Sequence, residues 1–332
     1  LHIHAPQWPQ AGLALDKPLN EWLNSYTFPL EAKFKDKEYA EKIYYSLIKE
    51  LLANGTTTGL FFGSIHNEAN LILAKICAKL GQRAFIGKVA MDNPDQTPDY
   101  YRDQNSQVAL KQTEAFIQKM FDLQKQTNAE ITPVITPRFV PSCTEETLQG
   151  LGQLAKKYDL PIQSHCSESI WEDHYALEHY HLRDTEVLDK FGLLTDKSVM
   201  AHGTQLSDQD LDTFNSRKTA IAHCPISNIY FGNSVMRVQD AHQKNVKVGL
   251  GTDISGGFSP SLYRNMQQSI MSSQVLTEQG HENARISAAN AFYLATVGGA
   301  NALHIKSGQI KSGFKADLQI VQDQYFNISS NE

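Results

Sequence analysis

The chain of 332 residues lacks several features that mark common classes of protein. It has no stretch of about 18 apolar residues, so we expect no membrane-spanning helix and no membrane partner. No run of Lys or Arg stands out and the formal net charge is −6 at pH 7, which argues against nucleic acid as a partner. No internal repeat, low-complexity segment or secretory signal peptide is found either.

Cysteine is scarce, and its spacing excludes two kinds of site. The four cysteines, Cys77, Cys143, Cys166 and Cys224, form no CxxC pair, so in a chain of this length they indicate reduced thiols and a cytoplasmic protein. Cys224-Pro225 is not the PCxxC motif of one class of zinc deaminase. The pair of glycines at 249 and 251 lacks the third glycine of a dinucleotide-binding GxGxxG motif.

Short apolar runs alternate with helical patterns along the chain, and hydrophobic residues make up 41% of it. The apolar runs predict eight strands, at 2–4, 57–62, 84–90, 131–136, 161–164, 198–201, 219–222 and 246–251. The helical patterns cover 37–54, 68–80, 106–126, 144–158, 169–191, 207–215 and 235–244, and a linker is expected around Trp22 and 26–29. Eight strands that alternate with helices predict an α/β fold of the (β/α)8 TIM-barrel type.

Polar residues follow most of these strands directly. The residues at the ends of the predicted strands are His2, His4, Arg138, His165, His202, His223 and Asp253. In barrels of this type, catalysis takes place at the face where the strands end. The strand pattern and the polar residues therefore point to one site.

His2-Ile3-His4 is the most informative motif, because side chains two residues apart on a strand point to the same face. Both imidazoles can therefore bind one metal ion. Together with His165, His202 and Asp253 they provide the nitrogen and oxygen ligands of an open catalytic metal site.

Glu168 follows His165 by three residues, so it could place an acid beside the metal and a substrate. Each of these later residues also has an ordinary interpretation: Glu168 could begin the next helix, His202 could be a hydrogen-bonded core histidine, and Asp253 could cap a helix. His223 is expected in a pocket wall or behind the ligands, with direct metal binding as the alternative, and a pocket role for His66 stays open. Cys166 follows His165 on a strand and is expected to point away from the metal.

The chain resembles the amidohydrolase superfamily and, within it, the guanine deaminase family. The matching segments cover nearly the whole chain in order: 2–7, 21–23, 26–29, 54–58, 81–88, 136–139, 163–165, 200–203, 222–225 and 249–253. The metal motifs are typical of the superfamily, whereas 81–88 and 136–139 narrow the resemblance to guanine deaminases.

The resemblance implies one Zn²⁺ per chain, bound by His2, His4, His165 and Asp253, with iron as the other candidate metal. It implies that Glu168 shuttles protons, that Asp253 accepts a proton from water, and that His202 supports the attacking water. The residues that it places around the purine are Gln7 and Arg138 as binding groups, with Phe139, Trp8 and Trp22 as stacking or lid groups.

The expected reaction is hydrolytic deamination of guanine to xanthine and ammonia, in purine catabolism. Two alternatives stay open: a deaminase or chlorohydrolase acting on another amino-substituted N-heterocycle, and a non-catalytic barrel that serves as a binding scaffold. We expect a homodimer with guanine as its small-molecule partner.

The predicted domains are a barrel at 1–305 and a segment at 306–332 that returns as a strand near 316–321. That segment is expected to be the remnant of a small β-sandwich domain whose N-terminal part is absent from this chain. Because His2 is a candidate ligand with almost nothing before it, we expect the chain to be a piece of a longer protein.

Overall fold

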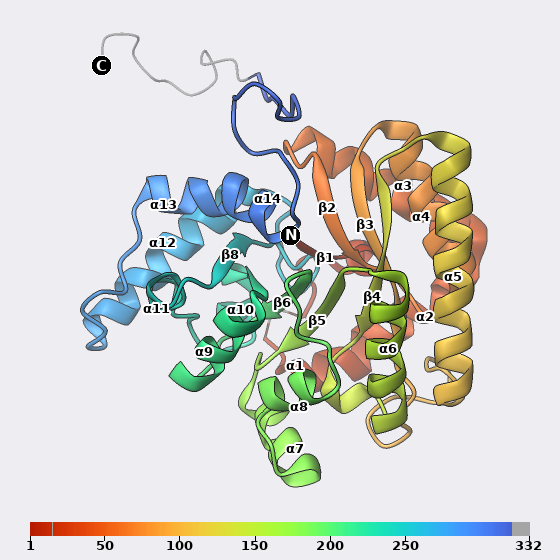
Figure 1. Ribbon diagram of the computed structural model, residues 1–332, viewed down its shortest axis with the longest axis horizontal. Helices are drawn as coiled ribbons and strands as arrows, with labels where there is room; N and C mark the ends of the chain where they lie inside the picture. Colours follow the sequence, from red (N-terminus) through yellow and green to blue (C-terminus); the bar gives the residue numbers. More distant parts are fainter. Residues whose placement is uncertain (15, 321–332) are drawn as a thin grey trace.

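The computed structural model contains a barrel of eight parallel strands (Figure 1), and it describes residues 1–14 and 16–320. The strands pair in sequence order and are β1 His2–His4, β2 Thr58–Phe62, β3 Arg83–Ala90, β4 Ile131–Pro137, β5 Ile162–Cys166, β6 Ser198–His202, β7 Ala220–His223 and β8 Lys247–Leu250. The predicted fold class is therefore confirmed, and every predicted strand of the barrel forms within a few residues of its expected bounds.

The barrel closes between β1 and the segment that follows β8. The Asp253 N–H donates to the His2 carbonyl at 2.9 Å, and the His4 N–H donates to the Ile254 carbonyl at 2.7 Å. The strand that carries two candidate ligands is thus joined by its backbone to the segment that carries a third.

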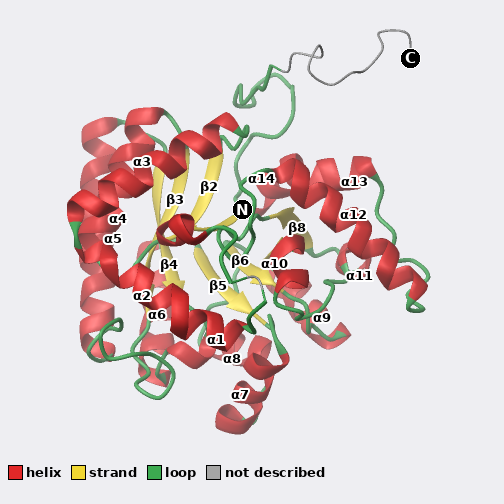
Figure 2. Ribbon diagram, turned by 180° about the vertical axis from the view of Figure 1, so that it is seen from behind, coloured by secondary structure: helices red, strands yellow, loops and turns green. Residues whose placement is uncertain are grey.

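Helices surround the strands (Figure 2). The α-helices are α1 Leu19–Trp22, α2 Phe28–Ala32, α3 Lys37–Ala53, α4 Asn67–Leu80, α5 Ser106–Thr127, α6 Glu145–Tyr158, α7 Ile170–Tyr180, α8 Asp184–Lys190, α9 Asp208–Arg217, α10 Pro225–Tyr230, α11 Val238–Gln243, α12 Leu262–Glu278, α13 Ala288–Tyr293 and α14 Gly299–Ala302. Short 3-10 turns occupy Ala5–Gln10, Lys33–Lys35 and Val140–Ser142, and π-helical turns occupy Leu23–Thr27 and Leu294–Gly298. No helix within the described residues combines the length and hydrophobicity needed to cross a bilayer.

Local sequence sets the ends of these helices. The Asp36 carboxylate accepts the N–H groups of Glu38 and Tyr39 and caps α3. Gly81 ends α4 with φ +79°, a left-handed conformation that glycine adopts without strain. These signals explain why the bounds of α3 and α4 follow from the sequence.

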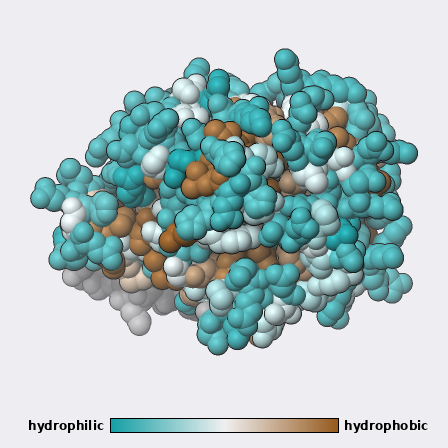
Figure 3. All heavy atoms as spheres, turned by 90° about the horizontal axis from the view of Figure 1, so that it is seen from below, coloured by the Kyte–Doolittle hydropathy of each residue, from teal (hydrophilic) through white to brown (hydrophobic). Residues whose placement is uncertain are grey.

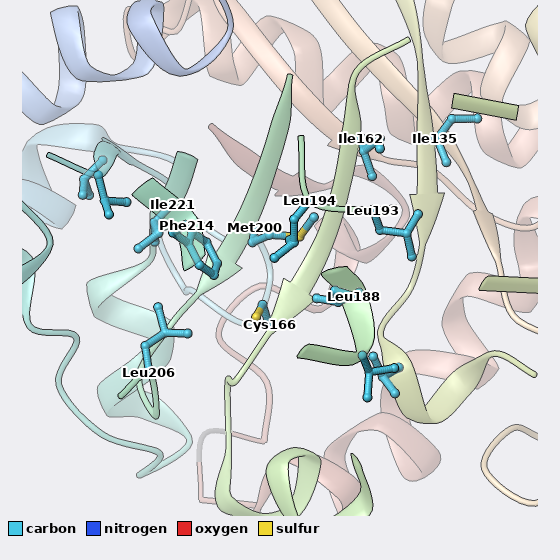
Figure 4. Close-up of a cluster of buried hydrophobic side chains, with 14 of the residues drawn as sticks. Ile135, Ile162, Cys166, Leu188, Leu193, Leu194, Met200, Leu206, Phe214 and Ile221 are labelled. Carbon is cyan, nitrogen blue, oxygen red and sulfur yellow. The ribbon is translucent and has the colours of Figure 1, made fainter. Parts of the chain in front are cut away.

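Apolar side chains pack on both sides of the strands. Small and branched residues such as Val199, Ala201 and Ala222 fill the barrel interior. Residues on the outward face of β5, β6 and β7, including Ile162 and Met200, pack against the helices (Figure 4). Strand alternation therefore separates the interior from the helix layer.

One segment differs from the sequence prediction. The expected linker around Trp22 and 26–29 is helical, because α1, the π-helical turn Leu23–Thr27 and α2 follow one another without a break. The helical patterns predicted at 169–191 form two helices, α7 and α8, since His181 adopts a left-handed φ of +55° after α7.

The returning strand predicted near 316–321 does not form in the described part of that segment, which ends at residue 320. Asp317 instead pairs with Arg83 at the start of β3, with an N–O distance of 2.9 Å. Residues from 321 onward lie outside the described residues, so the predicted β-sandwich segment at 306–332 stays a prediction.

Candidate metal and substrate site

The candidate site lies where the strands end. The arrows of β4, β5 and β6 point toward the side on which α1, α7 and α8 lie (Figure 1). Seen from that side, the surface carries apolar patches between hydrophilic ones (Figure 3). A pocket there encloses about 380 Å³ of space not filled by atoms, its open mouth included.

Four predicted metal ligands converge at the base of this pocket. The Nε2 atoms of His4 and His165 lie 3.0 Å apart, and Asp253 Oδ1 lies 3.0 Å from His2 Nε2 and 3.5 Å from His4 Nε2. All four side chains are buried. Ligands about 2.0–2.1 Å from a tetrahedral zinc ion are roughly 3.3 Å apart, so this donor cluster fits such an ion.

The protonation states of the cluster also fit a cation. Burial, reinforced by neighbouring histidines, holds the pKa of His2, His4 and His165 well below its ordinary value, so the imidazoles are neutral and keep a lone pair. Burial raises the pKa of Asp253. Within the described residues His2 Nε2 makes no hydrogen bond, although Asp253 Oδ1 lies 3.0 Å away. A metal cation at this position would bind the lone pairs of the neutral imidazoles. It would also stabilise the charged form of Asp253 and so lower the pKa of this carboxyl group.

His165 is oriented by its other ring nitrogen. Its Nδ1 makes a short hydrogen bond with the Arg138 carbonyl, which can only accept, so Nδ1 carries the proton and Nε2 faces the cluster. Metal-binding histidines commonly have such a partner.

His202 and Glu168 lie beside the cluster. His202 Nε2 is 3.7 Å from Glu168 Oε2 and 3.9 Å from Asp253 Oδ2, and His202 Nδ1 bonds Asn228 Oδ1 at 2.9 Å. Because that amide oxygen accepts, the neutral His202 ring is protonated on Nδ1 and presents a lone pair at Nε2. The ring donates from Nε2 only when both nitrogens are protonated.

Glu168 is suited to proton transfer. Burial, together with the Asp253 carboxylate, raises its pKa well above the ordinary value, although Arg138 opposes this shift. A carboxyl group that keeps its proton near neutral pH can act as a general acid. Its side-chain contact with Asn233 is loose, with an N–O distance of 3.4 Å.

Arg138 and Gln7 are held by a buried carboxylate that the sequence analysis did not identify. Glu31 Oε2 accepts from Arg138 Nη1 at 2.7 Å, and Glu31 Oε1 accepts from Arg138 Nη2 at 3.2 Å and from Gln7 Nε2 at 2.8 Å. Gln7 Oε1 accepts the Ser255 N–H at 3.3 Å, which sets the orientation of the amide. Glu31 lies on α2, in the segment that was expected to be a linker.

The ion pair determines which donors of Arg138 face a ligand. Glu31 occupies the guanidinium edge formed by Nη1 and Nη2. The edge formed by Nε and Nη2 is therefore the one that can contact a carbonyl group, because a guanidinium offers five donors and no acceptor.

Known proteins resemble this chain over nearly its whole length. The amidohydrolase family model matches residues 1–332. The chain is 42% identical to mouse guanine deaminase over 324 residues, which cover 96% of this chain and 70% of the relative. It is 34% identical to the guanine deaminase of Escherichia coli K12, over 97% of this chain and 71% of that one. The chain belongs to the amidohydrolase family.

A solved structure resembles this amidohydrolase over most of its length. Guanine deaminase from C. acetobutylicum, with guanine bound in the active site, superimposes with a TM-score of 0.88 at 38% identity. The match covers 94% of this chain and 74% of that one.

Most of the site residues predicted for this amidohydrolase lie together. The pocket is lined by His4, Gln7, Leu19, Trp22, Leu23, Arg138, Phe139, His165, Glu168, His202, Phe231, Asp253 and Gly256. Phe231, which the sequence analysis missed, packs edge-on against Trp22 with ring centroids 5.1 Å apart. Its only sequence signal is the short run Ile229-Tyr230-Phe231, and core residues give the same signal.

Trp8 is the exception among the predicted binding residues of the amidohydrolase. It lies away from the pocket and donates to Ser46 on α3 at 3.3 Å. Its place in the turn Ala5–Gln10 directs the indole toward that helix, so a stacking role for Trp8 is not supported.

The uncertain histidines are also placed outside the donor cluster. His223 Nε2 bonds Ser269 on α12 at 3.0 Å, behind the ligands, and burial lowers the pKa of His223 to about 3. The His66 ring lies 5.9 Å from the Tyr101 ring and does not line the pocket. Cys166 points into the helix layer, as strand alternation predicted.

Proposed function

We propose that this amidohydrolase catalyses the hydrolytic deamination of guanine, giving xanthine and ammonia. The observation that carries the proposal is that Arg138 and Gln7 share one pocket with Glu168 and Asp253. The chain is 42% and 34% identical to the guanine deaminases of mouse and Escherichia coli K12 over nearly its whole length, which supports the same reaction.

The proposed metal ligands are His2, His4, His165 and Asp253, with zinc as the proposed ion and iron as the alternative. Neutral imidazoles and a carboxylate are ligands that suit zinc. When bound there, the ion supplies Lewis acidity that makes water a competent nucleophile near neutral pH.

Two carboxyl groups divide the proton transfers in the proposed mechanism. A water molecule attacks C2 of guanine, and a carboxylate oxygen of Asp253 takes its proton. Glu168 gives its proton to a ring nitrogen next to C2, which disperses the charge that develops during attack. The hydroxyl group on C2 then gives its proton to Glu168, Glu168 protonates the amine, and the C2–N bond breaks so that ammonia leaves and the oxygen stays as the C2 carbonyl. His202 lies between both carboxyl groups, so its Nε2 takes the water proton from Asp253, donates to the attacking oxygen, and passes this proton to Glu168 at the end of the cycle.

Recognition of guanine is assigned to Arg138 and Gln7. The Nε and Nη2 edge of Arg138 donates to the carbonyl at C6, and the Gln7 amide contacts the neighbouring ring-nitrogen edge. Phe139 lies 6.2 Å from His165, between ring centroids, and is proposed to pack on the purine with Trp22 at the mouth. Adenine carries an amine at C6 and would leave Arg138 without an acceptor.

The direct experiment is to incubate the purified, zinc-loaded protein with guanine and to measure xanthine and ammonia. Adenine, cytosine and chlorinated or aminated N-heterocycles form the comparison panel. Equal specificity constants for guanine and another heterocycle would favour the broader deaminase or chlorohydrolase alternative. Binding of guanine without turnover, at full metal occupancy, would favour the scaffold alternative. A homodimer and a cytoplasmic location stay predictions, to be checked by light scattering and cell fractionation.

A further inference from the structure

Two buried carboxyl groups hold the backbone of the loop that carries Glu168. Glu172 Oε2 accepts the Glu168 N–H at 2.6 Å, and Asp184 Oδ2 accepts the Ser167 N–H at 3.0 Å. Glu172 is 2% exposed and Asp184 is fully buried. Neither lines the pocket, and the mechanism above uses neither of them.

The contact made by Glu172 is unlike an ordinary helix cap. Ser169 is the N-cap of α7 and Glu172 is its third residue, the position from which a glutamate usually bonds the N–H of the N-cap residue. Here the carboxylate reaches one residue further back, to Glu168. Glu172 therefore binds the backbone of Glu168, the residue assigned to proton transfer, instead of the backbone of the N-cap residue Ser169.

The carbonyl groups of the same loop are held from the next loop. Thr204 Oγ1 donates to the Glu168 carbonyl at 2.6 Å, and the Gln205 N–H donates to the Ser167 carbonyl at 3.0 Å. Ser167 has φ +48°, a left-handed conformation that a serine adopts only when its surroundings impose it. The backbone on both sides of Glu168 is therefore constrained at each polar group.

Burying these two acids is energetically costly. Burial, with the nearby Asp184 and Glu168, raises the pKa of Glu172 well above its ordinary value, and burial raises the pKa of Asp184 to about 7. Glu172 Oε1 and Asp184 Oδ1 have no hydrogen-bond partner within the described residues. Buried polar atoms without partners are rare, so a local function is the expected reason for their presence.

We propose that Glu172 is a positioning residue for the reaction: it fixes the backbone of Glu168 so that the Glu168 carboxyl group reaches the reacting ring nitrogen. Asp184 fixes the preceding residue in the same way. This inference rests on the proposed role of Glu168 in guanine deamination. What matters is that the Glu172 side chain is long enough to place an acceptor oxygen at the Glu168 N–H. The negative charge of Glu172 is not required.

Two substitutions separate reach from charge. Glu172→Asp keeps the carboxylate and withdraws it by one methylene, so it should lower kcat on the order of 10²-fold, the loss that a displacement of about 1 Å produces. Glu172→Gln keeps an oxygen at the same reach and should retain most of kcat. KM for guanine should stay unchanged in both, since Arg138 and Gln7 are untouched. A larger loss in Glu172→Gln than in Glu172→Asp would overturn the proposal.

A double-mutant cycle tests whether Glu172 acts through Glu168. In a Glu168→Gln background the proton-transfer group is already lost, so adding Glu172→Asp should cost little further activity. A full additional loss in that background would mean that Glu172 supports the fold in general, and would also overturn the proposal. Glu178→Asp makes the same chemical change on the exposed face of α7 and should leave kcat unaltered.

The unmodified protein separates failure of this inference from failure of the proposed function. No ammonia from guanine in the zinc-loaded protein would reject the function itself. Normal turnover that is indifferent to Glu172→Asp would reject the positioning role alone.

Discussion

At the scale of single residues, backbone conformation decides which side chains enter the site. Met200 on β6 faces the helix layer, and strand alternation would send His202 the same way. His202 instead has φ +74° and its ring lies 5.3 Å from that of His2. His223, two residues after the outward Ile221, keeps the alternation and faces α12. The φ angle of His202 thus turns its ring into the candidate site, whereas the His223 ring lies outside it.

Glu168→Gln tests the proton-transfer role at this scale. The amide keeps the size of the side chain but carries no transferable proton, so kcat should fall roughly 10²–10⁴-fold while metal content stays complete. Stopped assays of ammonia release, together with metal analysis of the same sample, check this. Near-normal turnover would show that Glu168 transfers no proton and is only the residue that precedes the N-cap of α7.

Arg138→Met tests substrate choice. Methionine removes every donor, so the specificity constant for guanine should fall by about 10²-fold or more, because a polar pocket discriminates by the bonds it makes. The unmodified protein should reject adenine and cytosine. Because the substitution leaves Glu31 buried and without its cation, Glu31→Gln/Arg138→Met is the matched variant that removes this unpaired charge. Equal activity on guanine and cytosine before mutation would contradict the assignment.

At the scale of elements, close packing between a helix and a neighbouring backbone limits sequence choice. A Cβ atom at Gly152 on α6 would lie 2.0 Å from the carbonyl oxygen of Phe191, which follows α8. A Cβ atom at Gly150 on the same helix would meet only the end of the Leu110 side chain, at 2.3 Å. The first contact involves rigid backbone, whereas the second involves a side chain that can rotate.

Gly152→Ala and Gly150→Ala should therefore change the free energy of unfolding in opposite directions or by different amounts. Alanine favours helix by up to about 1 kcal/mol over glycine, so Gly150→Ala should change the free energy of unfolding little or raise it. Gly152→Ala should lower it by about 1–3 kcal/mol through overpacking against α8. Urea denaturation of both variants gives the comparison. Equal stabilities would show that α6 can move away from Phe191.

At the scale of the whole molecule, the candidate metal site joins distant parts of the chain. Its donors come from β1, from the end of β5 and from the segment after β8, the same segment that closes the barrel onto β1. A ligand that binds only the folded state stabilises it by mass action. Metal binding should therefore stabilise the closed barrel as a whole.

Removing the metal should lower thermal stability. With metal at about 1,000 times its Kd, the stabilisation is about 4 kcal/mol, and a chelator should lower Tm by roughly 6 °C. Adding Zn²⁺ back should restore it. His165→Ala should bind no metal tightly and show no response to the chelator. An unchanged Tm in a fully demetallated protein would contradict a metal that links these segments.

The barrel and most of the candidate ligands follow from local patterns in the sequence. Period-two and helical patterns of apolar residues are local, so they appear in the chain before folding. The i, i+2 spacing of His2 and His4 and the position of His165 after a strand are local as well. For this reason the eight strands, their order and the convergence of the candidate ligands could be predicted.

Only the fold shows which residues far from the site in sequence contact it or hold its side chains in place. Glu31 stands in a segment with no periodic signal and meets Arg138 107 residues later. Trp8 and Trp22 look alike in sequence, yet only Trp22 lines the pocket. Glu172 resembles any capping glutamate until its bond to Glu168 is seen. These roles depend on long-range packing and on individual dihedral angles, which the pattern of residue types along one chain does not encode.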